Sequence, residues 1–225
     1  MHKNNITPLQ VSKIILLNGA PGAGKDTSAN ILFNEYPGSQ TMAFADHLKE
    51  EAHRAVGLDA PARNLDDYKD VPMPMLNGNT PRQLYIHYSS VIKRFKGDTY
   101  WASNVAETIE HNGAGVYVVS DLGYEYEAHT LAEEFGHENI RVVRLHRPEY
   151  GYEYDSRHLC YPEYILGYDI HNDGDWDALR YKLLWTLSEF LGLPESFRMD
   201  VDRWVETDHN PVDEWVEQQL MHDDG

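Results

Sequence analysis

The nine residues that decide the fold run from Gly19 to Thr27 and read Gly19-Ala20-Pro21-Gly22-Ala23-Gly24-Lys25-Asp26-Thr27. The apolar run 13–18 precedes them and predicts a buried strand, while residues 24–36 predict a helix that stops before Pro37-Gly38. A glycine-rich loop between a strand and a helix brings backbone N–H groups close to an anion, and the helix N-terminus adds a partial positive charge. This context predicts a phosphate-binding loop.

Each position of the loop has an expected task in binding ATP. Gly19, Gly22 and Gly24 lack the Cβ atoms that would obstruct phosphate oxygens, and Ala23 leaves its backbone accessible. Lys25 supplies a cation that can follow a transferring phosphoryl group. The hydroxyl comes one residue later than in the strict pattern, because Asp26 follows Lys25 and Thr27 follows Asp26. We therefore expect Mg²⁺ to be held mainly by ATP phosphates and waters, with Thr27 as the candidate protein ligand.

Outward from the loop, apolar strands alternate with amphipathic helices. Further strands are predicted at 40–44, 115–121, 140–146 and 167–171, and further helices at 44–56, 80–95, 98–111, 124–135 and 175–192. Thr80-Pro81 is a strong helix start, and the apolar stripe of that helix is expected to run from Leu84 to Phe95. Alternating elements predict an α/β fold with a parallel sheet sandwiched by helices. Together with the phosphate loop, they favour a fold of the P-loop kinase type.

Composition limits the classes of partner. The 225 residues carry 37 acidic against 19 basic side chains, a net charge of -18, which argues against a nucleic-acid partner. No apolar run approaches the roughly 18 residues that a membrane span needs, so no membrane partner is expected. The single cysteine, Cys160, cannot form an internal disulfide. Together these features favour a cytoplasmic protein.

Several charged residues are site candidates by position, each with a structural alternative. Asp121 ends a predicted strand at the ligand edge, but it could instead cap the helix 124–135. Arg82 stands in the first turn of a helix, where a cation opposes the dipole, and this favours a phosphate contact. Glu127 could bind a sugar or base, or belong to a solvated helix face.

Other candidates come from the helix 44–56, from the aromatic residues and from the segment 147–166. Asp46 and Lys49 could line the substrate pocket or form a helix-surface pair, and Trp101 could stack on a base or lie in the core. Arg147 and Arg157 are the preferred catalytic arginines, since phosphoryl transfer needs cations that a closing lid can deliver, whereas Arg144 is expected to pack within its strand. The histidines show no zinc-site spacing.

With the phosphate loop as anchor, residues 13–190 resemble the deoxynucleoside monophosphate kinases of bacteriophages. The similar segments, in order, are Phe44–Lys49, Thr80–Leu84, Thr99–Trp101, Val118–Asp121 with Glu127, Arg147-Pro148, Ser156–His158 and His171–Gly174. The resemblance implies ATP-dependent, Mg²⁺-assisted phosphorylation of a nucleoside monophosphate, a role in deoxynucleotide metabolism and a location in the host cytoplasm. It places Asp46, Lys49, Arg82, Trp101 and Glu127 on the substrate side and Lys25, Asp121, Arg147 and Arg157 at the reaction centre.

Two departures from the family pattern lie on the presumed acceptor side. Gly123 stands where the family has an arginine, two residues after the strand-end aspartate, and Ser89-Ser90-Val91 replaces a Gly-Thr-acid segment. These departures bear on the acceptor rather than on the ATP chemistry.

The predicted organisation is one kinase domain over 1–193, with an acceptor-binding region at about 45–112 and a lid at about 147–166. Residues 194–225 hold ten acidic residues against two arginines and form an acidic extension. A homodimer is compatible with the sequence. Three alternatives stay open: a kinase of hydroxymethylated pyrimidines in phage DNA, a relative of dephospho-coenzyme A kinase, and a non-catalytic nucleotide-binding switch.

Overall fold

The computed structural model describes residues 11–58, 62–153 and 155–193. The predicted acidic extension 194–225 and the N-terminal ten residues of the predicted domain lie outside these ranges. Within them, no helix is both long enough and apolar enough to cross a bilayer.

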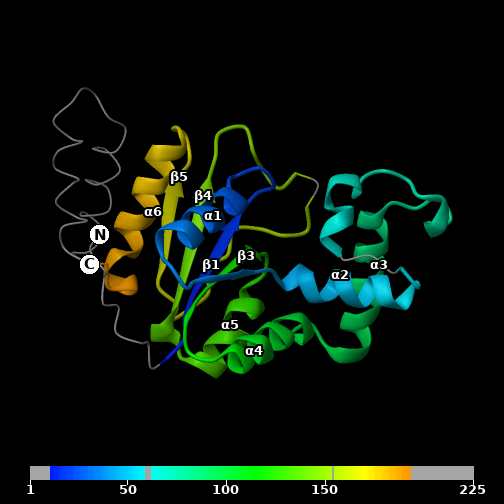
Figure 1. Cartoon of the computed structure of the whole chain (residues 1–225), viewed down its shortest axis with the longest axis horizontal. Coiled ribbons are helices and arrows are strands. Elements are labelled where there is room, and N and C mark those ends of the chain that lie inside the picture. The colour runs from blue at the N-terminus through cyan, green and yellow to red at the C-terminus, as the bar shows by residue number, and fades with distance from the viewer. Residues whose placement is uncertain (1–10, 59–61, 154, 194–225) are drawn as a thin grey trace.

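A five-stranded parallel sheet forms the centre, in the order β2-β3-β1-β4-β5 (Figure 1). The strands are β1 Lys13–Gly19, β2 Gln40–Met42, β3 Val116–Leu122, β4 Ile140–His146 and β5 Gly167–His171. The α-helices are α1 Lys25–Glu35, α2 Phe44–Ala55, α3 Pro81–Lys96, α4 Tyr100–Asn112, α5 Glu125–Phe135 and α6 Trp176–Leu191. The predicted α/β fold with a parallel sheet between helices is thereby confirmed.

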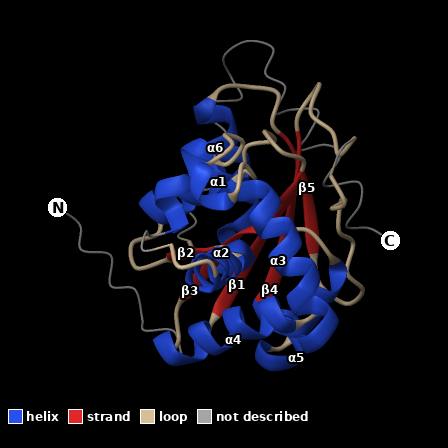
Figure 2. Cartoon of the chain, turned by 90° about the vertical axis from the view of Figure 1, so that its right-hand side faces the viewer, coloured by secondary structure: helices blue, strands red, loops and turns tan. Residues whose placement is uncertain are grey.

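Alternation along β1 explains the two helical layers. Ile15 and Leu17 point into a core formed with α1 and α6, whereas Ile14 and Leu16 point into a second core formed with α4 and α5. Figure 2 shows these helix pairs on opposite sides of the sheet. Both faces of β1 are therefore buried, which is why its sequence is a continuous apolar run.

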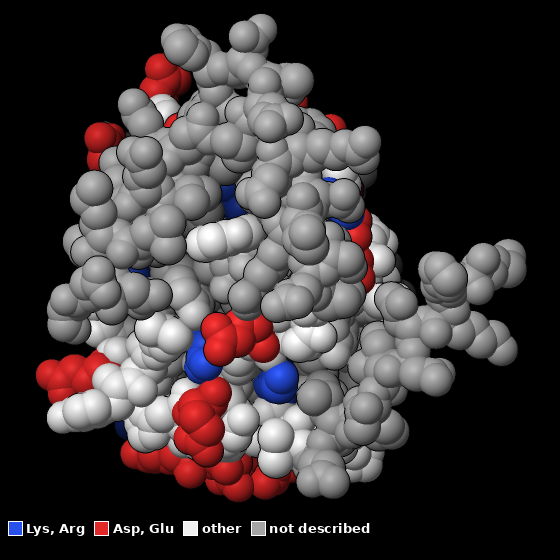
Figure 3. Space-filling model, turned by 90° about the vertical axis from the view of Figure 1, so that its left-hand side faces the viewer, with Lys and Arg blue, Asp and Glu red and all other residues white. Residues whose placement is uncertain are grey.

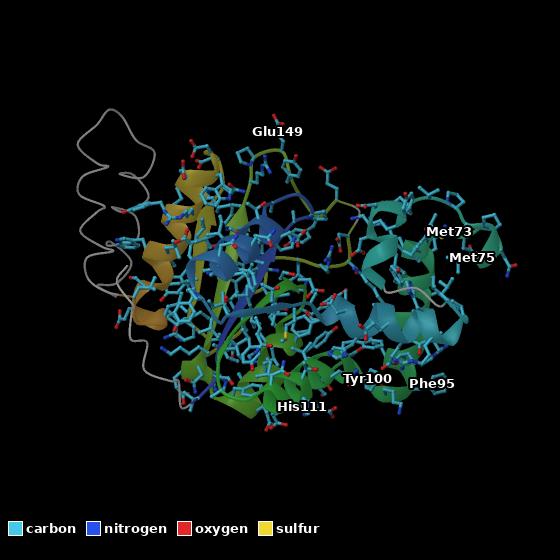
Figure 4. The ribbon with its side chains drawn as sticks, in the orientation of Figure 1. Met73, Met75, Phe95, Tyr100, His111 and Glu149 are labelled. Carbon is cyan, nitrogen blue, oxygen red and sulfur yellow. The ribbon has the colours of Figure 1, made fainter. Side chains whose placement is uncertain are left out.

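Helices α2 and α3 project beyond the sheet, joined by the segment 56–80 (Figure 1). This segment contains two short 3₁₀ helices, η1 Ala62–Tyr68 and η2 Pro74–Leu76. Met73 and Met75 of this segment lie with Phe95 at the end of the molecule away from α6 (Figure 4). A third 3₁₀ helix, η3 His137–Asn139, leads into β4.

The predicted start of α3 is confirmed, but its predicted apolar stripe is wrong at the C-terminal end. Thr80 accepts a hydrogen bond from the backbone N–H of Gln83, and the Gln83 side chain accepts one from the N–H of Thr80. Phe95 is 79% exposed, whereas Tyr85, outside the predicted stripe, is buried. Because α3 packs mainly on α2 rather than on the sheet, only a narrow part of its surface is covered.

Candidate functional site

The phosphate loop occupies the turn between β1 and α1, at the carboxyl end of the central strand. Gly22 and Gly24 have φ values of 81° and 104°, which side chains other than glycine rarely adopt. A Cβ on Gly24 would also lie 2.4 Å from the amide nitrogen of Asn172. Backbone conformation and close packing thus both require the glycines that the sequence placed here.

Lys25 begins α1 and lies across the mouth of the loop. Its Nζ donates hydrogen bonds to the carbonyl oxygens of Gly19 at 2.7 Å and Ala20 at 2.9 Å. Burial, followed by the charge of Arg157, lowers the pKa of Lys25 below its ordinary value, while nearby aspartates oppose the shift. Phosphate oxygens entering the loop would give this ammonium stronger partners than carbonyl groups.

Asn172 contacts the phosphate loop from the turn after β5, and it was not among the residues predicted for the site. Its amide nitrogen donates to the carbonyl of Ala23 at 2.8 Å, while its backbone N–H donates to the carbonyl of His146 at 2.7 Å. The buried Lys182 supports the same turn through the carbonyl of His171 and the carboxylate of Asp173. The Asn172-Asp173-Gly174 sequence was the available signal for this contact.

Arg147 and Tyr150 cover the loop from the segment that follows β4. Arg147 Nη1 donates to the carbonyl of Gly22 at 3.2 Å, and its guanidinium lies 5.0 Å from the Tyr150 ring centroid. The Tyr150 ring is so close that a Cβ on Gly22 would lie 2.2 Å from it. Between them, Glu149 marks the tip of this segment in Figure 4. The first part of the predicted lid therefore lies on the phosphate loop.

Asp121 lies near the end of β3, the strand beside β1. Its two carboxylate oxygens accept hydrogen bonds from the backbone N–H groups of Phe44 at 2.8 Å and Ala45 at 3.0 Å. It therefore holds the N-terminus of α2, and these contacts are not the cap of α5 that was the structural alternative for this residue. Burial raises its pKa, against these two hydrogen bonds and the charge of Arg157.

Arg157 belongs to the predicted lid segment and lies within electrostatic range of Asp121. Its guanidinium is paired with Asp155, whose Oδ1 accepts from Nε at 2.9 Å and from the backbone N–H of Arg157 at 3.0 Å. This pairing holds the pKa of Asp155 below its usual range. The charge of Arg157 also acts on Lys25 and Asp121, so these three predicted reaction-centre residues share one electrostatic environment.

The acceptor-side cations are each paired with an aspartate of the segment between α2 and α3. Arg82 forms a bidentate pair with Asp70, at 2.5 and 3.0 Å, on the surface. Lys49 pairs with Asp66 at 2.6 Å. The charges of Arg157 and Asp155 act on Arg82, so the first turn of α3 lies within electrostatic range of the lid.

Three predicted substrate-side residues have structural roles in the fold. Asp46 accepts from the backbone N–H of Ala43 at 2.9 Å and stabilises the start of α2. Trp101 is 3% exposed and packs in the core, so its assignment as a base-stacking residue is wrong. Glu127 is buried and accepts from the N–H groups of Gly123 and Tyr124, which excludes the solvated helix face.

Asn18, a buried residue of β1, was missed by sequence reasoning. Its Nδ2 donates to the carbonyls of Leu122 at 2.8 Å and His158 at 3.0 Å, and its Oδ1 accepts from the N–H of Cys160 at 2.9 Å. It thereby connects the second half of the predicted lid segment to the sheet. An amide at the end of an otherwise apolar strand was the signal.

Arg144 packs as expected and forms a bidentate pair with Asp169 of β5. The described ranges also bring together Glu125, His158 and Cys160, whose ligand atoms lie within 4.8 Å of one another. Burial raises the pKa of the Cys160 thiol to about 12, which opposes the thiolate that a metal ion needs. Thr27, the candidate protein ligand for a nucleotide-bound Mg²⁺, is exposed in the first turn of α1.

Comparisons with known proteins give distant structural likenesses. No protein-family model matches the chain, and no curated protein matches it. Among solved structures, a gluconokinase from Sinorhizobium meliloti has a TM-score of 0.40 at 11% identity, over 82% of this chain and 95% of its own. A shikimate kinase from Acinetobacter baumannii has 0.39 at 16%, over 81% and 95%. A thymidylate kinase from Candida albicans has 0.38 at 11%, over 80% and 92%. Likenesses at this level carry no argument about the substrate.

Proposed function

We propose that this protein transfers the γ-phosphoryl group of ATP to the phosphate of a deoxynucleoside monophosphate. The observation that carries the proposal is the position of Lys25 on the central strand's loop, within one electrostatic environment with Asp121 and Arg157. Ligands of open parallel sheets bind at the carboxyl ends of the strands, and both the loop and Asp121 lie there. The sequence resemblance of residues 13–190 to phage deoxynucleoside monophosphate kinases supports the choice of acceptor.

The donor half is the phosphate loop with its cover. Backbone N–H groups from Gly22 to Lys25 and the α1 N-terminus bind the β- and γ-phosphates, and Lys25 exchanges its two carbonyl partners for phosphate oxygens. Arg147 and Tyr150 lie over the loop and exclude water from the nucleotide. Mg²⁺ bound with ATP would neutralise phosphate charge next to Thr27.

The acceptor half lies between the end of β3 and the helices α2 and α3. An acceptor phosphate oxygen attacks the γ-phosphorus in line, the bond to the β,γ-bridging oxygen breaks, and ADP leaves with that electron pair. Lys49 and Arg82 supply cations on this side, where each is paired with an aspartate. Phosphate can compete for such partners because it accepts bidentate, charge-assisted hydrogen bonds.

A coupled assay that measures ADP formation tests the proposal. Purified full-length protein is supplied with ATP, Mg²⁺ and each of the common ribo- and deoxyribonucleoside monophosphates. We expect turnover of at least one deoxynucleotide, and its loss in the Lys25→Ala variant. Intact ATP binding with no turnover of any monophosphate would overturn the assignment.

Two parallel reactions separate the alternatives. Transfer of labelled phosphate to duplex DNA containing hydroxymethylated pyrimidines, with none to free monophosphates, would favour the DNA kinase. The net charge of -18 disfavours DNA binding, and acidic side chains gather along the lower edge of the described part of the face in Figure 3. Transfer to dephospho-coenzyme A alone would favour that relative, and bound ATP without any transfer would favour a switch.

A further inference from the structure

Gly123, directly after β3, has no backbone reason to be glycine. Its φ angle is not positive, so residues with a side chain could adopt the same backbone conformation. A Cβ on Gly123, however, would lie 2.7 Å from both Cγ and Cδ of Arg157. The missing side chain therefore admits the aliphatic part of Arg157, and this contact joins the lid to the end of the strand that carries Asp121.

The segment that carries Arg157 is anchored on both sides. Ser156 lies 2.8 Å from the hydroxyl of Tyr124, and His158 pairs with Glu125 at 2.8 Å. The backbone of His158 is further held by Asn18 at 3.0 Å. Arg147 differs, since within the described part of the chain its side chain donates one hydrogen bond, a 3.2 Å contact to the phosphate loop. The position of Arg157 is thus fixed by contacts of its neighbours, whereas Arg147 lies over the phosphate loop.

Asp155 orients the guanidinium of Arg157 but does not bind all of the N–H groups of that guanidinium. The Asp155 carboxylate accepts hydrogen bonds from Nε and Nη2 of Arg157. Among the described residues no hydrogen bond from Nη1 is recorded, so one edge of the fork stays available to an anion. The charge of Arg157 acts on both Lys25 and Arg82, so Arg157 lies within electrostatic range of the donor loop and of the first turn of α3.

We propose that the two lid arginines divide the substrates. Arg157, seated on Gly123 and positioned by Asp155, binds the phosphate of the acceptor, while Arg147 serves the nucleotide on the loop. This inference rests on the proposed function and adds Gly123 and Asp155 as determinants of acceptor affinity. Gly123 acts by leaving space, and Asp155 acts through Arg157 rather than on the substrate.

Calorimetry and kinetics on the full-length protein test this division. Binding of deoxynucleoside monophosphates is measured in the presence of a non-hydrolysable ATP analogue, and binding of the analogue is measured alone. For Arg157→Ala and Gly123→Ala we expect monophosphate affinity to fall about tenfold or more, the effect of one charge-assisted contact, with analogue affinity unchanged. Arg147→Ala should show the reverse pattern.

Two controls separate the effect of losing the Gly123–Arg157 contact from a general disturbance of the fold. Gly115→Ala lies at the other end of β3, where a Cβ would meet its nearest atom at an ordinary 3.5 Å, and it should leave both affinities unchanged. In an Arg157→Ala background, Gly123→Ala should lose its effect on monophosphate binding, because the side chain it displaces is gone. Asp155→Asn should weaken the monophosphate more than the analogue.

The outcomes also distinguish this inference from the proposed function. Monophosphate binding that depends on Arg157 without turnover would retain the inference and reject the kinase. Turnover with Arg157→Ala binding unchanged, or with analogue binding lost instead, would reject the inference and retain the kinase. Absence of both binding and turnover in the wild-type protein would reject both.

Discussion

Asn18 donates from its side-chain amide to the carbonyl oxygen of His158 at 3.0 Å, so a residue of the central strand holds the second half of the predicted lid segment. Replacement by alanine would leave the N–H of Cys160 and the carbonyl of Leu122 without this partner in a buried place. An unsatisfied buried group costs about 1–3 kcal/mol. We expect Asn18→Ala to lower the free energy of unfolding in urea by at least that amount.

Asn112→Ala provides the matched control. Asn112 is exposed, and its amide makes a single 3.0 Å contact with Gln40. Its loss should change the free energy of unfolding by less than about 0.5 kcal/mol. Equal effects of the two substitutions would contradict the role assigned to Asn18.

The thiol of Cys160 reports on the same contact. Cys160 is fully buried, and burial raises its pKa to about 12, so very little thiolate exists at pH 8. It is also the single cysteine of the chain, which makes its labelling unambiguous. We expect a chromogenic disulfide reagent to react slowly with the folded protein and rapidly in denaturant. Asn18→Ala should accelerate the slow reaction, and rapid labelling of the folded wild type would show that residues 158–160 are not held as described.

The contrast between Lys25 and Asn18 shows what the sequence could predict. Lys25 was identified because the phosphate loop is a local motif, whose strand, glycines and helix start are contiguous. Asn18 and Asn172 act on residues 140 and 149 positions away, respectively, and no local pattern records such partners. The strands and helices of the sheet were predictable for the same local reason, since burial on one or both faces sets their periodicity.

The substrate-side candidates were harder to assign from the sequence. Trp101 and Glu127 gave no signal of which side of their helices would face the sheet, and both proved to be buried. Gly123 was recognised as a departure, yet the side chain that takes its space comes from residue 157, across a long loop. Asp121 was placed correctly at the strand end, but its partner helix precedes it in the chain by 77 residues.

Glu127 makes stability depend on pH. The pKa of Glu127 rises from its ordinary 4.5 to about 7 in the folded protein, and burial of the carboxyl group is the largest cause of this shift. Between these values the folded state binds more protons than the unfolded state, so its contribution to stability falls as the pH rises from about 4.5 to 7. The full change is on the order of 3 kcal/mol, since one pKa unit corresponds to about 1.4 kcal/mol.

The measurement compares urea unfolding of wild type and Glu127→Gln at pH 5 and pH 7.5. Glutamine keeps an acceptor for the N–H groups of Gly123 and Tyr124 but does not titrate. We expect wild type to lose stability relative to the variant over this interval. The exposed Glu163→Gln should follow wild type at both pH values. Parallel curves for wild type and Glu127→Gln would exclude the shift.

Lys25 is expected to separate activity from stability. Its ammonium is partly desolvated, and burial lowers its pKa. Holding the charged form at the loop therefore reduces the stability of the folded protein. Lys25→Ala should therefore leave the free energy of unfolding unchanged or slightly increased. If phosphoryl transfer is the function, kcat should fall by about 10²-fold or more, because a preorganised cation on the transferring group is lost. The exposed Lys69→Ala should change neither quantity. Turnover by Lys25→Ala within threefold of wild type would show that the loop lysine does not act on the transferring phosphate, whatever the acceptor.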